Sequence, residues 1–416
     1  MPAAITLAIL ASSPALAIFQ PPPPARLASP DPVPEETFGY FIALDGPFAV
    51  TSDYYASLGP AVYVYDLDAN TVETLTPSSS SGGSLFGISV DVSGSSLIAG
   101  DIVNSEFASS QGAAFVFVES AGAWSEQQAL YPPVAAGNEQ FGRVVAIDGD
   151  TAIVGAPGTS GASGAAHIFT RTAGVWTLEA TLQPGDLVSG DFFGLRVAIH
   201  GDTVAVGAPV LDGQAGADQG AVYIFTRSAG VWTQQAKLFP SAPQADALFG
   251  ATLALSGDTC AVSAYYQDTA AGADSGAVFV FERAGVSWME VATLTPTGVG
   301  PGDLFGAGCD VEGDTLVISA PDDDDISMDA GAAYVYRRIE GVWTEGEKIL
   351  PTTGAPGEGS GYSVALSDGI FLLAAGNGPH LFVEEPTPQP PSADITGDGV
   401  VNGEDLAALL ASWGTP

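Results

Sequence analysis

The chain has 416 residues, a formal net charge of −38, and 48 Asp and Glu against only 10 Lys and Arg. This balance argues strongly against nucleic-acid binding, because phosphate contacts need clustered Lys and Arg, and it disfavours docking on anionic membranes. With 46% hydrophobic and only 14% charged residues, the composition excludes a disordered chain and allows a large core.

The N-terminal residues 1–17 have the pattern of an export signal. An apolar stretch from Ala3 to Leu10 precedes Ala15-Leu16-Ala17, which resembles an A-x-A cleavage site. The Lys or Arg that usually precedes such a stretch is absent, and the alternative is a buried N-terminal segment. Neither this run nor any later stretch is long enough to span a bilayer. We therefore expect a signal peptide, export to the cell envelope or beyond, and no transmembrane span in the mature chain.

Residues 18–384 are dominated by a repeat. The dipeptide Phe-Gly recurs at intervals of 48 to 56 residues, and a seventh, degenerate copy has Ser360-Gly361. The six phenylalanines are Phe38, Phe86, Phe141, Phe193, Phe249 and Phe305. One copy contains four short apolar segments, FGRVVAI, TAIVGAP, GAAHIFTR and WTLEATLQP, separated by turn residues. Four strands repeated at about 50 residues predict a β-propeller blade, so the fold class is all-β with seven blades.

The seventh copy lacks a fourth strand, because a proline-rich segment follows HLFV at residues 380–383. The segment Ala25–Gly39 aligns without gaps on Ala292–Gly306, which includes the end of a fourth strand. We therefore predict that the N-terminal segment supplies the outermost strand of the last blade. Closing the ring in this way removes the two open edges of the array.

The copies resemble FG-GAP repeats, the propeller blades of integrin α-subunits and of many secreted bacterial proteins. The resemblance rests on the Phe-Gly pairs and on Gly155-Ala156-Pro157 and Gly207-Ala208-Pro209, and it covers roughly residues 25–384. It implies an integrin α-like propeller and a role in protein binding or adhesion, although this fold hosts many functions. The DxDxDG calcium loops of integrin blades have no counterpart here, so no blade calcium site is expected.

The connections between strands fall on two faces, because the chain direction alternates within a blade. The turn face carries short, similar turns such as Asp-Gly-Asp-Thr, and the variable-loop face carries the long second-to-third and blade-to-blade connections. Variable loops on a rigid scaffold are where binding usually occurs. Two interpretations of their acidic residues stay open: solvated loops, or a surface for a cation-dependent or basic partner. These residues are Asp101, Glu106, Asp186, Asp191, Asp212, Asp218, Asp268, Asp274 and Asp322 to Asp325.

No catalytic motif is present, and we expect a non-enzymatic protein. The sequence lacks G-x-S-x-G, a P-loop, H-E-x-x-H and Cys/His zinc spacing. His167 and His380 occupy a third-strand position that is aromatic in other copies, which indicates packing, and His200 aligns with the turn residue Asp148. We identify no copy that breaks the pattern to place the paired carboxylates of a glycosidase at the channel mouth.

We expect structural roles for the tryptophans and cysteines. Five tryptophans mark the starts of fourth strands and indicate blade packing rather than a sugar platform. They are Trp124, Trp176, Trp232, Trp288 and Trp343. Cys260 and Cys309 are either one disulfide or two buried thiols.

Residues 385–393 form a proline-rich linker, and residues 394–416 form a distinct tail. The run D-I-T-G-D-G-V-V-N-G-E-D places oxygen ligands at loop positions 1, 3, 5, 9 and 12, with Gly399 at position 6. Leu406, Leu409, Leu410 and Trp413 follow on one helical face. The sequence therefore predicts an EF-hand-type Ca²⁺ site, and the alternative is a Gly/Asp turn before a short helix. The predicted ligands are Asp394, Thr396, Asp398, Asn402, Asp405 and the backbone carbonyl of Val400.

The tail resembles a type I dockerin repeat, a calcium module by which secreted proteins attach to cohesin-bearing scaffolds. A full dockerin has two such repeats and this chain has one, so a cohesin-like partner is implied only in part. We expect an exported propeller that binds an extracellular or envelope protein, or a glycan, through its variable-loop face. The alternative is a component of an extracellular polysaccharide-degrading system.

Overall fold

A computed structural model describes residues 18–20, 26–31, 37–56, 59–79, 84–351, 354–376 and 378–385. The chain divides into two compact units, residues 21–382 and residues 1–20 with 383–416. The predicted signal peptide (1–17) and calcium tail (394–416) lie outside the described residues.

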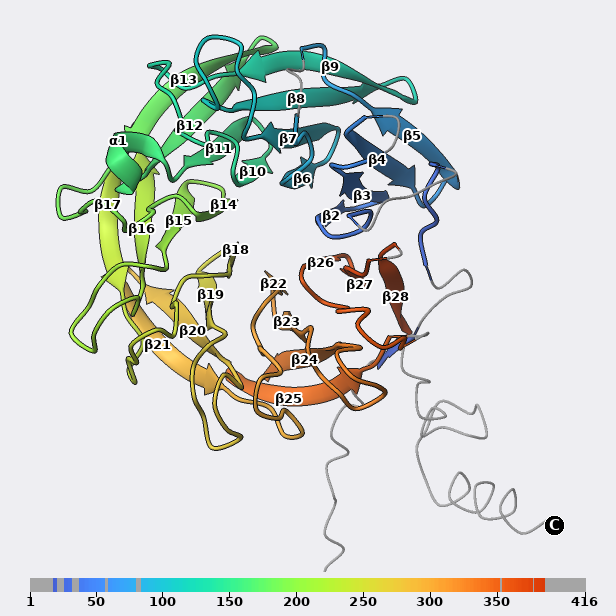
Figure 1. Cartoon of the computed structure of the whole chain (residues 1–416), viewed down its shortest axis with the longest axis vertical. Coiled ribbons are helices and arrows are strands. Elements are labelled where there is room, and N and C mark those ends of the chain that lie inside the picture. Colours follow the sequence, from blue (N-terminus) through green and yellow to red (C-terminus); the bar gives the residue numbers. More distant parts are fainter. Residues whose placement is uncertain are drawn as a thin grey trace, which may run out of the picture. The chain divides into compact units, whose positions relative to one another are not determined.

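Residues 21–382 form a ring of antiparallel sheets, which are the blades of a propeller (Figure 1). Blades 1 to 6 each consist of four consecutive strands, β2–β5, β6–β9, β10–β13, β14–β17, β18–β21 and β22–β25, and the seventh sheet has the order β1-β28-β27-β26. The predicted all-β, seven-bladed fold is confirmed. Among the described residues, helix is limited to α1 (Thr159–Ala162), a single turn between β11 and β12.

The strands occupy four equivalent positions in the blades. The first strands, which line the central channel, are β2 (Ile42–Asp45), β6 (Val90–Ser93), β10 (Val145–Asp148), β14 (Arg196–His200), β18 (Leu253–Ser256), β22 (Cys309–Glu312) and β26 (Val364–Ser367). The second strands are β3 (Phe48–Asp53), β7 (Ser96–Asp101), β11 (Thr151–Ala156), β15 (Thr203–Ala208), β19 (Thr259–Ala264), β23 (Thr315–Ala320) and β27 (Ile370–Leu373).

The third and fourth strands complete each blade. The third strands are β4 (Ala61–Asp66), β8 (Ala113–Ser120), β12 (Ala165–Thr172), β16 (Ala221–Ser228), β20 (Ala277–Ala284), β24 (Ala332–Ile339) and β28 (His380–Glu385). The fourth strands are β5 (Thr71–Leu75), β9 (Ala123–Leu130), β13 (Val175–Leu182), β17 (Val231–Leu238), β21 (Ser287–Leu294), β25 (Val342–Ile349) and β1 (Ile18–Gln20). Second strands such as β11 are buried along their whole length, whereas fourth strands such as β21 alternate between exposed and covered residues. This gradient is expected where neighbouring blades cover the inner strands on both faces.

The N-terminal residues supply the outer strand of the last sheet, as predicted. β1 pairs with β28 from Ile18↔Glu385 to Gln20↔Val383. Further along, Arg26 bridges His380, and the Leu27 N–H donates to the Pro379 carbonyl at 3.0 Å. This pairing begins before Ala25, where the repeat alignment starts.

The Phe-Gly pairs form the junctions between blades. The six phenylalanines are almost fully buried, and each ring lies 5.3 to 5.7 Å from the aromatic or histidine ring of the third strand. The Phe249 N–H also donates to the Gln219 carbonyl of the preceding blade at 3.0 Å. Ser360 makes the equivalent bond to Ala330 at 3.1 Å, which shows that the degenerate seventh copy keeps the junction without its aromatic ring.

A repeated ion pair occupies the turn face in blades 3 to 6. In each blade, a third-strand arginine donates from Nε to a turn aspartate at 2.6 Å. Its guanidinium lies 5.0 to 5.6 Å from the ring centroid of the fourth-strand tryptophan. These sets are Arg171 with Asp150 and Trp176, Arg227 with Asp202 and Trp232, Arg283 with Asp258 and Trp288, and Arg338 with Asp314 and Trp343. The tryptophans therefore pack under arginines, in agreement with their predicted role in the blades.

Candidate functional site

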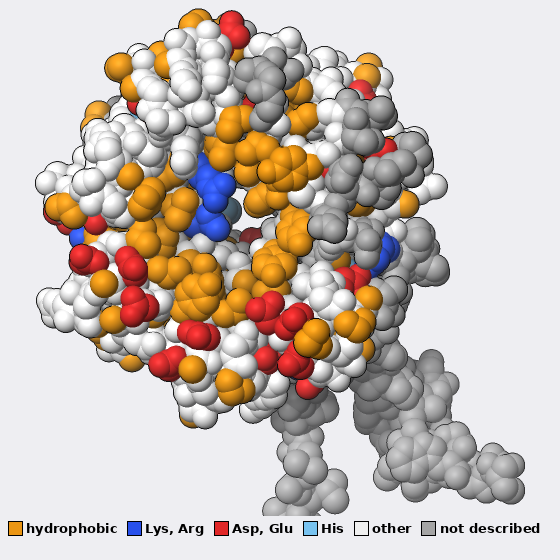
Figure 2. Space-filling model, in the orientation of Figure 1, with side chains coloured by type: hydrophobic (Ala, Val, Ile, Leu, Met, Phe, Trp, Pro, Cys, Tyr) orange, Lys and Arg blue, Asp and Glu red, His pale blue; other side chains and the backbone are white. Residues whose placement is uncertain are grey.

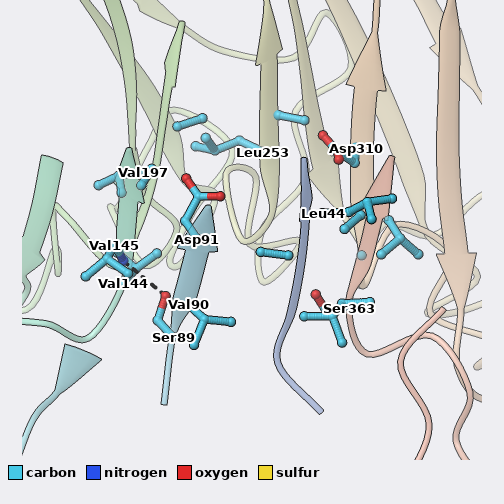
Figure 3. Close-up of a pocket in the computed structure, with 18 of the residues that line it drawn as sticks. Leu44, Ser89, Val90, Asp91, Val144, Val145, Val197, Leu253, Asp310 and Ser363 are labelled. Atoms are coloured by element: carbon cyan, nitrogen blue, oxygen red, sulfur yellow. Dashed lines mark hydrogen bonds between the residues drawn. The ribbon is translucent and has the colours of Figure 1, made fainter. Parts of the chain in front are cut away.

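The first strands of the seven blades enclose a central cavity of about 520 Å³ (Figure 3). One mouth lies on the variable-loop face, where the first strands begin, and the other lies on the turn face, where they end. The channel is the place where all seven blades contribute side chains to one site.

Side chains of one blade accept hydrogen bonds from the backbone N–H groups along the open edge of the next blade's first strand. Ser89, Asp91 and Ser93 accept hydrogen bonds of 2.7 to 3.1 Å from backbone N–H groups of β10 and the turn that follows it. Figure 3 shows the bond from the Val145 N–H to Ser89. Unpaired backbone groups on a strand edge need such partners. These residues therefore join blade 2 to blade 3.

Two carboxylates break the repeat pattern inside the channel, which the sequence interpretation missed. Asp91 and Asp310 occupy a first-strand position that holds alanine in the other five blades. Figure 3 shows both carboxyl groups directed into the cavity. Burial raises the pKa of each to about 7, although backbone N–H donors act in the opposite direction. Each carboxylate accepts two backbone N–H groups, one of them from the following blade, so both hold neighbouring blades together.

At the turn-face mouth, most polar groups are hydrogen-bonded to one another. At six of the seven junctions, the last residue of a first strand accepts a bond of 2.5 to 3.2 Å from the turn N–H of the next blade. His200 holds the seventh position, and no such bond is present there among the described residues. Its side chain is exposed, as the alignment with Asp148 predicted. The acceptors are Asp45, Ser93, Asp148, Ser256, Glu312 and Ser367.

The variable-loop mouth differs because it carries two cations that have no ion pair among the described residues. All ten Lys and Arg fall among the described residues, and eight of them form ion pairs with Asp or Glu there. The exceptions are Arg143 and Arg196, in neighbouring blades, and both line the cavity. Burial lowers the pKa of Arg196, and the charge of Arg143 lowers it further. Within the part of the chain that the structure describes, the one hydrogen bond of either guanidinium runs from Arg196 Nη1 to the Leu195 carbonyl, at 2.9 Å.

Tyrosines lie on the same face, and Tyr54 and Tyr265 are close to Arg143 and Arg196 respectively. Tyr40 and Tyr362 have ring centroids 5.4 Å apart, and the sequence neighbours Tyr54 and Tyr55 lie 4.9 Å apart. Burial raises the pKa of Tyr54, and the nearby Arg143 acts against that rise. Tyr55 is 60% exposed and Tyr362 is 47% exposed. Figure 2 shows Lys and Arg side chains at the central hollow, hydrophobic side chains around it, and acidic side chains further out.

Most acidic residues predicted on this face hold their own loops or blades. Asp101 accepts bonds from Ser84 and the Leu85 N–H, and Asp191 accepts the Val188 N–H at 2.7 Å. Asp186 pairs with Lys237, Asp323 and Asp325 pair with Lys348, and Asp212, Asp268 and Asp324 accept loop N–H groups. Within the described part of the chain, no group of three or more His, Cys, Asp or Glu side chains is arranged to hold a metal ion.

The histidines and cysteines have structural environments. His167 is buried against Phe141 and lies 3.1 Å from Thr181 Oγ1, and burial lowers its pKa to about 4. His380 is fully buried and contacts Arg26 and Glu358, which joins the N-terminal segment to the last blade. Cys260 and Cys309 are buried free thiols rather than a disulfide.

The predicted calcium ligands lie outside the described residues. Asp394, Thr396, Asp398, Val400, Asn402 and Asp405 all fall after residue 385, the last that the structure describes. The missed residues Arg143 and Arg196 could have been found in the repeats themselves. Among the seven copies, only those at FGRVVAI and LRVAIH place arginine near the start of the first strand.

The fold and its Phe-Gly junctions define a seven-bladed β-propeller. The FG-GAP repeat model matches residues 124–169, 176–225, 232–281 and 288–336. Each match runs from the fourth strand of one blade to the third strand of the next. The chain is therefore a propeller that carries FG-GAP repeats, which confirms this part of the sequence prediction.

Solved structures show the same architecture. A chain in the crystal structure titled "Crystal Structure of Mitotic Checkpoint Complex" is similar, with a TM-score of 0.51 and 15% sequence identity. The match covers 86% of this chain and 93% of that chain, and at this identity it shows the fold alone. A search of curated proteins found no match. Over the residues that the structure describes, no helix is both long and apolar enough to cross a membrane.

Proposed function

We propose that the protein is an exported, non-enzymatic binding protein that takes up its ligand at the variable-loop mouth of the channel. The observation that carries this proposal is the pair Arg143 and Arg196, which line the cavity without a carboxylate partner among the described residues. The FG-GAP propeller fold is consistent with a binding or adhesion role. Exposed tyrosines on the same face, and two cations with no ion pair among the described residues, are groups that a ligand could contact.

The contrast between the two mouths supports the choice of face. At the turn face, a first-strand side chain accepts a bond from the turn N–H of the next blade at six of the seven junctions. At the variable-loop face, Tyr55 and Tyr362 are exposed, and the two guanidinium groups have no ion pair in the described chain. A ligand gains more binding free energy from polar and aromatic groups that are not already bonded to other groups of the protein.

Attachment through calcium is the second part of the proposal. The tail from Asp394 to Asp405 would bind one Ca²⁺ and fix the propeller to an envelope or scaffold partner of the cohesin type. Calorimetry on the full chain tests this. We expect one calcium-binding event that disappears in Asp398→Ala and persists in Asp212→Ala, a variant in a blade loop. Equal calcium binding by wild type and Asp398→Ala would contradict it.

A pull-down from secreted and envelope fractions tests the binding proposal. We expect the wild-type chain to capture a partner that the double variant Arg143→Ala/Arg196→Ser does not capture. The matched control is Arg171→Gln, which removes the same kind of charge from the turn face. The capture is repeated with calcium and with chelator to separate the tail from the mouth. A partner that the double variant retains would place the binding site elsewhere.

The alternative, a component of a polysaccharide-degrading system, draws on Asp91 and Asp310. Both carboxyl groups face the cavity and have a pKa near 7, which suits proton transfer at neutral pH. Hydrolysis of any member of a polysaccharide panel, lost in Asp91→Asn with the fold retained, would favour this alternative over the binding function.

A further inference from the structure

We propose that the variable-loop mouth binds one carboxylate group of a terminal acidic sugar residue, held between Arg143 and Arg196. This inference rests on the proposed binding function and names its ligand class. It combines three features of the mouth: two guanidinium groups without an ion pair in the described chain, tyrosines on the same face, and acidic residues further out.

The fold does not need arginine at either position. Arg143 is equivalent to Ala251 and Ala307 in blades 5 and 6, where a methyl group suffices. Arg196 is equivalent to Ser89, whose hydroxyl joins two blades, and to Ser363. The two cations are half-buried, and the charge of one disfavours the charge of the other. Such a pair is unfavourable without a counterion and becomes favourable when an anion lies between them.

The anion carries a single charge rather than a row of charges. The protein has a net charge of −38, and Asp322 and Asp329 lie near Tyr362, whose pKa rises through burial first and then through Asp322. A polyanion that reaches the arginines would also lie against these carboxylates and be repelled. A chain end with one carboxylate reaches Arg143 and Arg196 and leaves an uncharged remainder beside the acidic side of the mouth.

That remainder fits a sugar. Tyr40 and Tyr362 form a tilted pair, Tyr265 and Tyr266 form another at 4.6 Å, and these rings offer apolar faces beside hydroxyl groups. The C–H faces of a pyranose ring pack on aromatic rings, and its hydroxyl groups donate to carboxylates such as Asp322. The occupant we infer is therefore a uronate-type residue at the end of a glycan, with the carboxylate toward blades 3 and 4.

Titration of the full-length protein with glucuronate, followed by calorimetry, tests the site. We expect binding that weakens with added salt, at least a tenfold loss of affinity in Arg143→Ala/Arg196→Ser, and no loss in Arg171→Gln. Glucose, which lacks the carboxylate, is expected to bind at least tenfold more weakly. The replacements are residues that other blades already carry, and a thermal melt verifies the fold of each variant. The single variant Arg196→Ser is the second probe and is expected to lose part of the affinity.

Each contrary outcome overturns a defined part of the proposal. Equal affinity for glucose and glucuronate would show that the site does not recognise the carboxylate. A peptide with a free C-terminal carboxylate that binds through both arginines, where glucuronate does not, would replace the sugar class. If polygalacturonate binds more tightly per residue than its monomer galacturonate, the inference that the site takes a ligand with a single charge would be contradicted. No glucuronate binding, together with a pull-down partner that the double variant still loses, would overturn the ligand class and leave the proposed function standing.

Discussion

The two faces of the propeller use arginine in opposite ways. At the turn face of blades 3 to 6, each arginine donates to a turn aspartate at 2.6 Å and lies over a tryptophan. At the variable-loop mouth, Arg143 and Arg196 have neither kind of partner among the described residues. In a chain with only ten Lys and Arg, eight are used to hold blades and loops together. The comparison separates arginines that the fold requires from arginines that it tolerates.

The largest expected difference between the two faces concerns glycine. Gly220 lies on the variable-loop face at a positive φ of 85°, and an added Cβ would overlap the carbonyl oxygen of Phe249 in the next blade. Gly257 lies in a turn at a φ of 57° with open space around its Cβ position. We expect Gly220→Ala to lower the free energy of unfolding by about 3 kcal/mol or more, and Gly257→Ala by about 1 kcal/mol. Urea denaturation measures the free energy of unfolding of both variants. Equal losses would contradict the close contact between Gly220 and the next blade.

The channel between the two faces is expected to make stability depend on pH. The folded-state pKa of Asp91 and Asp310 is raised from 3.8 to about 7, so the folded protein binds more protons than the unfolded chain between these values. Their contribution to the free energy of unfolding is therefore full below pH 3.8, decreases as pH rises to about 7, and levels off above it. We expect about 2 kcal/mol per carboxyl, reduced from the full linkage value because the cavity is open to water.

The matched variants are Asp91→Asn and Asp310→Asn, which keep an oxygen acceptor and remove the charge. The difference in unfolding free energy between pH 5 and pH 8 is expected to shrink in each variant. Asp148→Asn, at the turn-face mouth, is the control. An unchanged pH profile in both channel variants would show that these groups titrate as in the unfolded chain.

Much of the fold follows from the sequence because its determinants recur. The burial of Phe193 and Phe249 at equivalent junctions is what fixes the Phe-Gly spacing, and the alignment of Ala25–Gly39 predicted the closing strand. Because the blades repeat, aligning the copies shows which residues occupy equivalent positions. It also revealed the packing roles of Trp176 and His167.

The candidate site could not be predicted in the same way, because it depends on which residues lack partners. Arg171 and its partner Asp150 are 21 residues apart, whereas Arg26 and Glu358 are 332 residues apart. Only the closed ring shows that Arg143 has no such partner in the described chain. Asp91 and Asp310 were visible as departures from alanine, but their direction into the channel depends on the register of the first strands.

Loss of a paired arginine is expected to have a moderate effect. Arg338 donates to Asp314 at 2.6 Å and to Glu282 of the preceding blade at 2.8 Å, and lies over Trp343. Since Asp314 is mostly exposed, its ion pair is screened by water. We expect Arg338→Ala to lower the free energy of unfolding by about 1 kcal/mol, mainly through the lost tryptophan contact and the junction with blade 5. Urea denaturation at two salt concentrations checks this, and a loss that disappears entirely at high salt would assign the effect to charge alone.

The smallest expected effect on stability is at the variable-loop mouth. Arg143→Ala removes a half-buried charge that repels Arg196 and leaves no carboxylate without its partner in the described chain. We expect the free energy of unfolding to stay within about 0.5 kcal/mol of the wild type or to rise. The same denaturation measurement that detects the loss in Arg338→Ala serves here. A loss of similar size in Arg143→Ala would show that the fold depends on this arginine, and its position at the mouth would then no longer indicate a ligand. Neutral stability together with lost glucuronate binding would separate the two kinds of arginine by experiment.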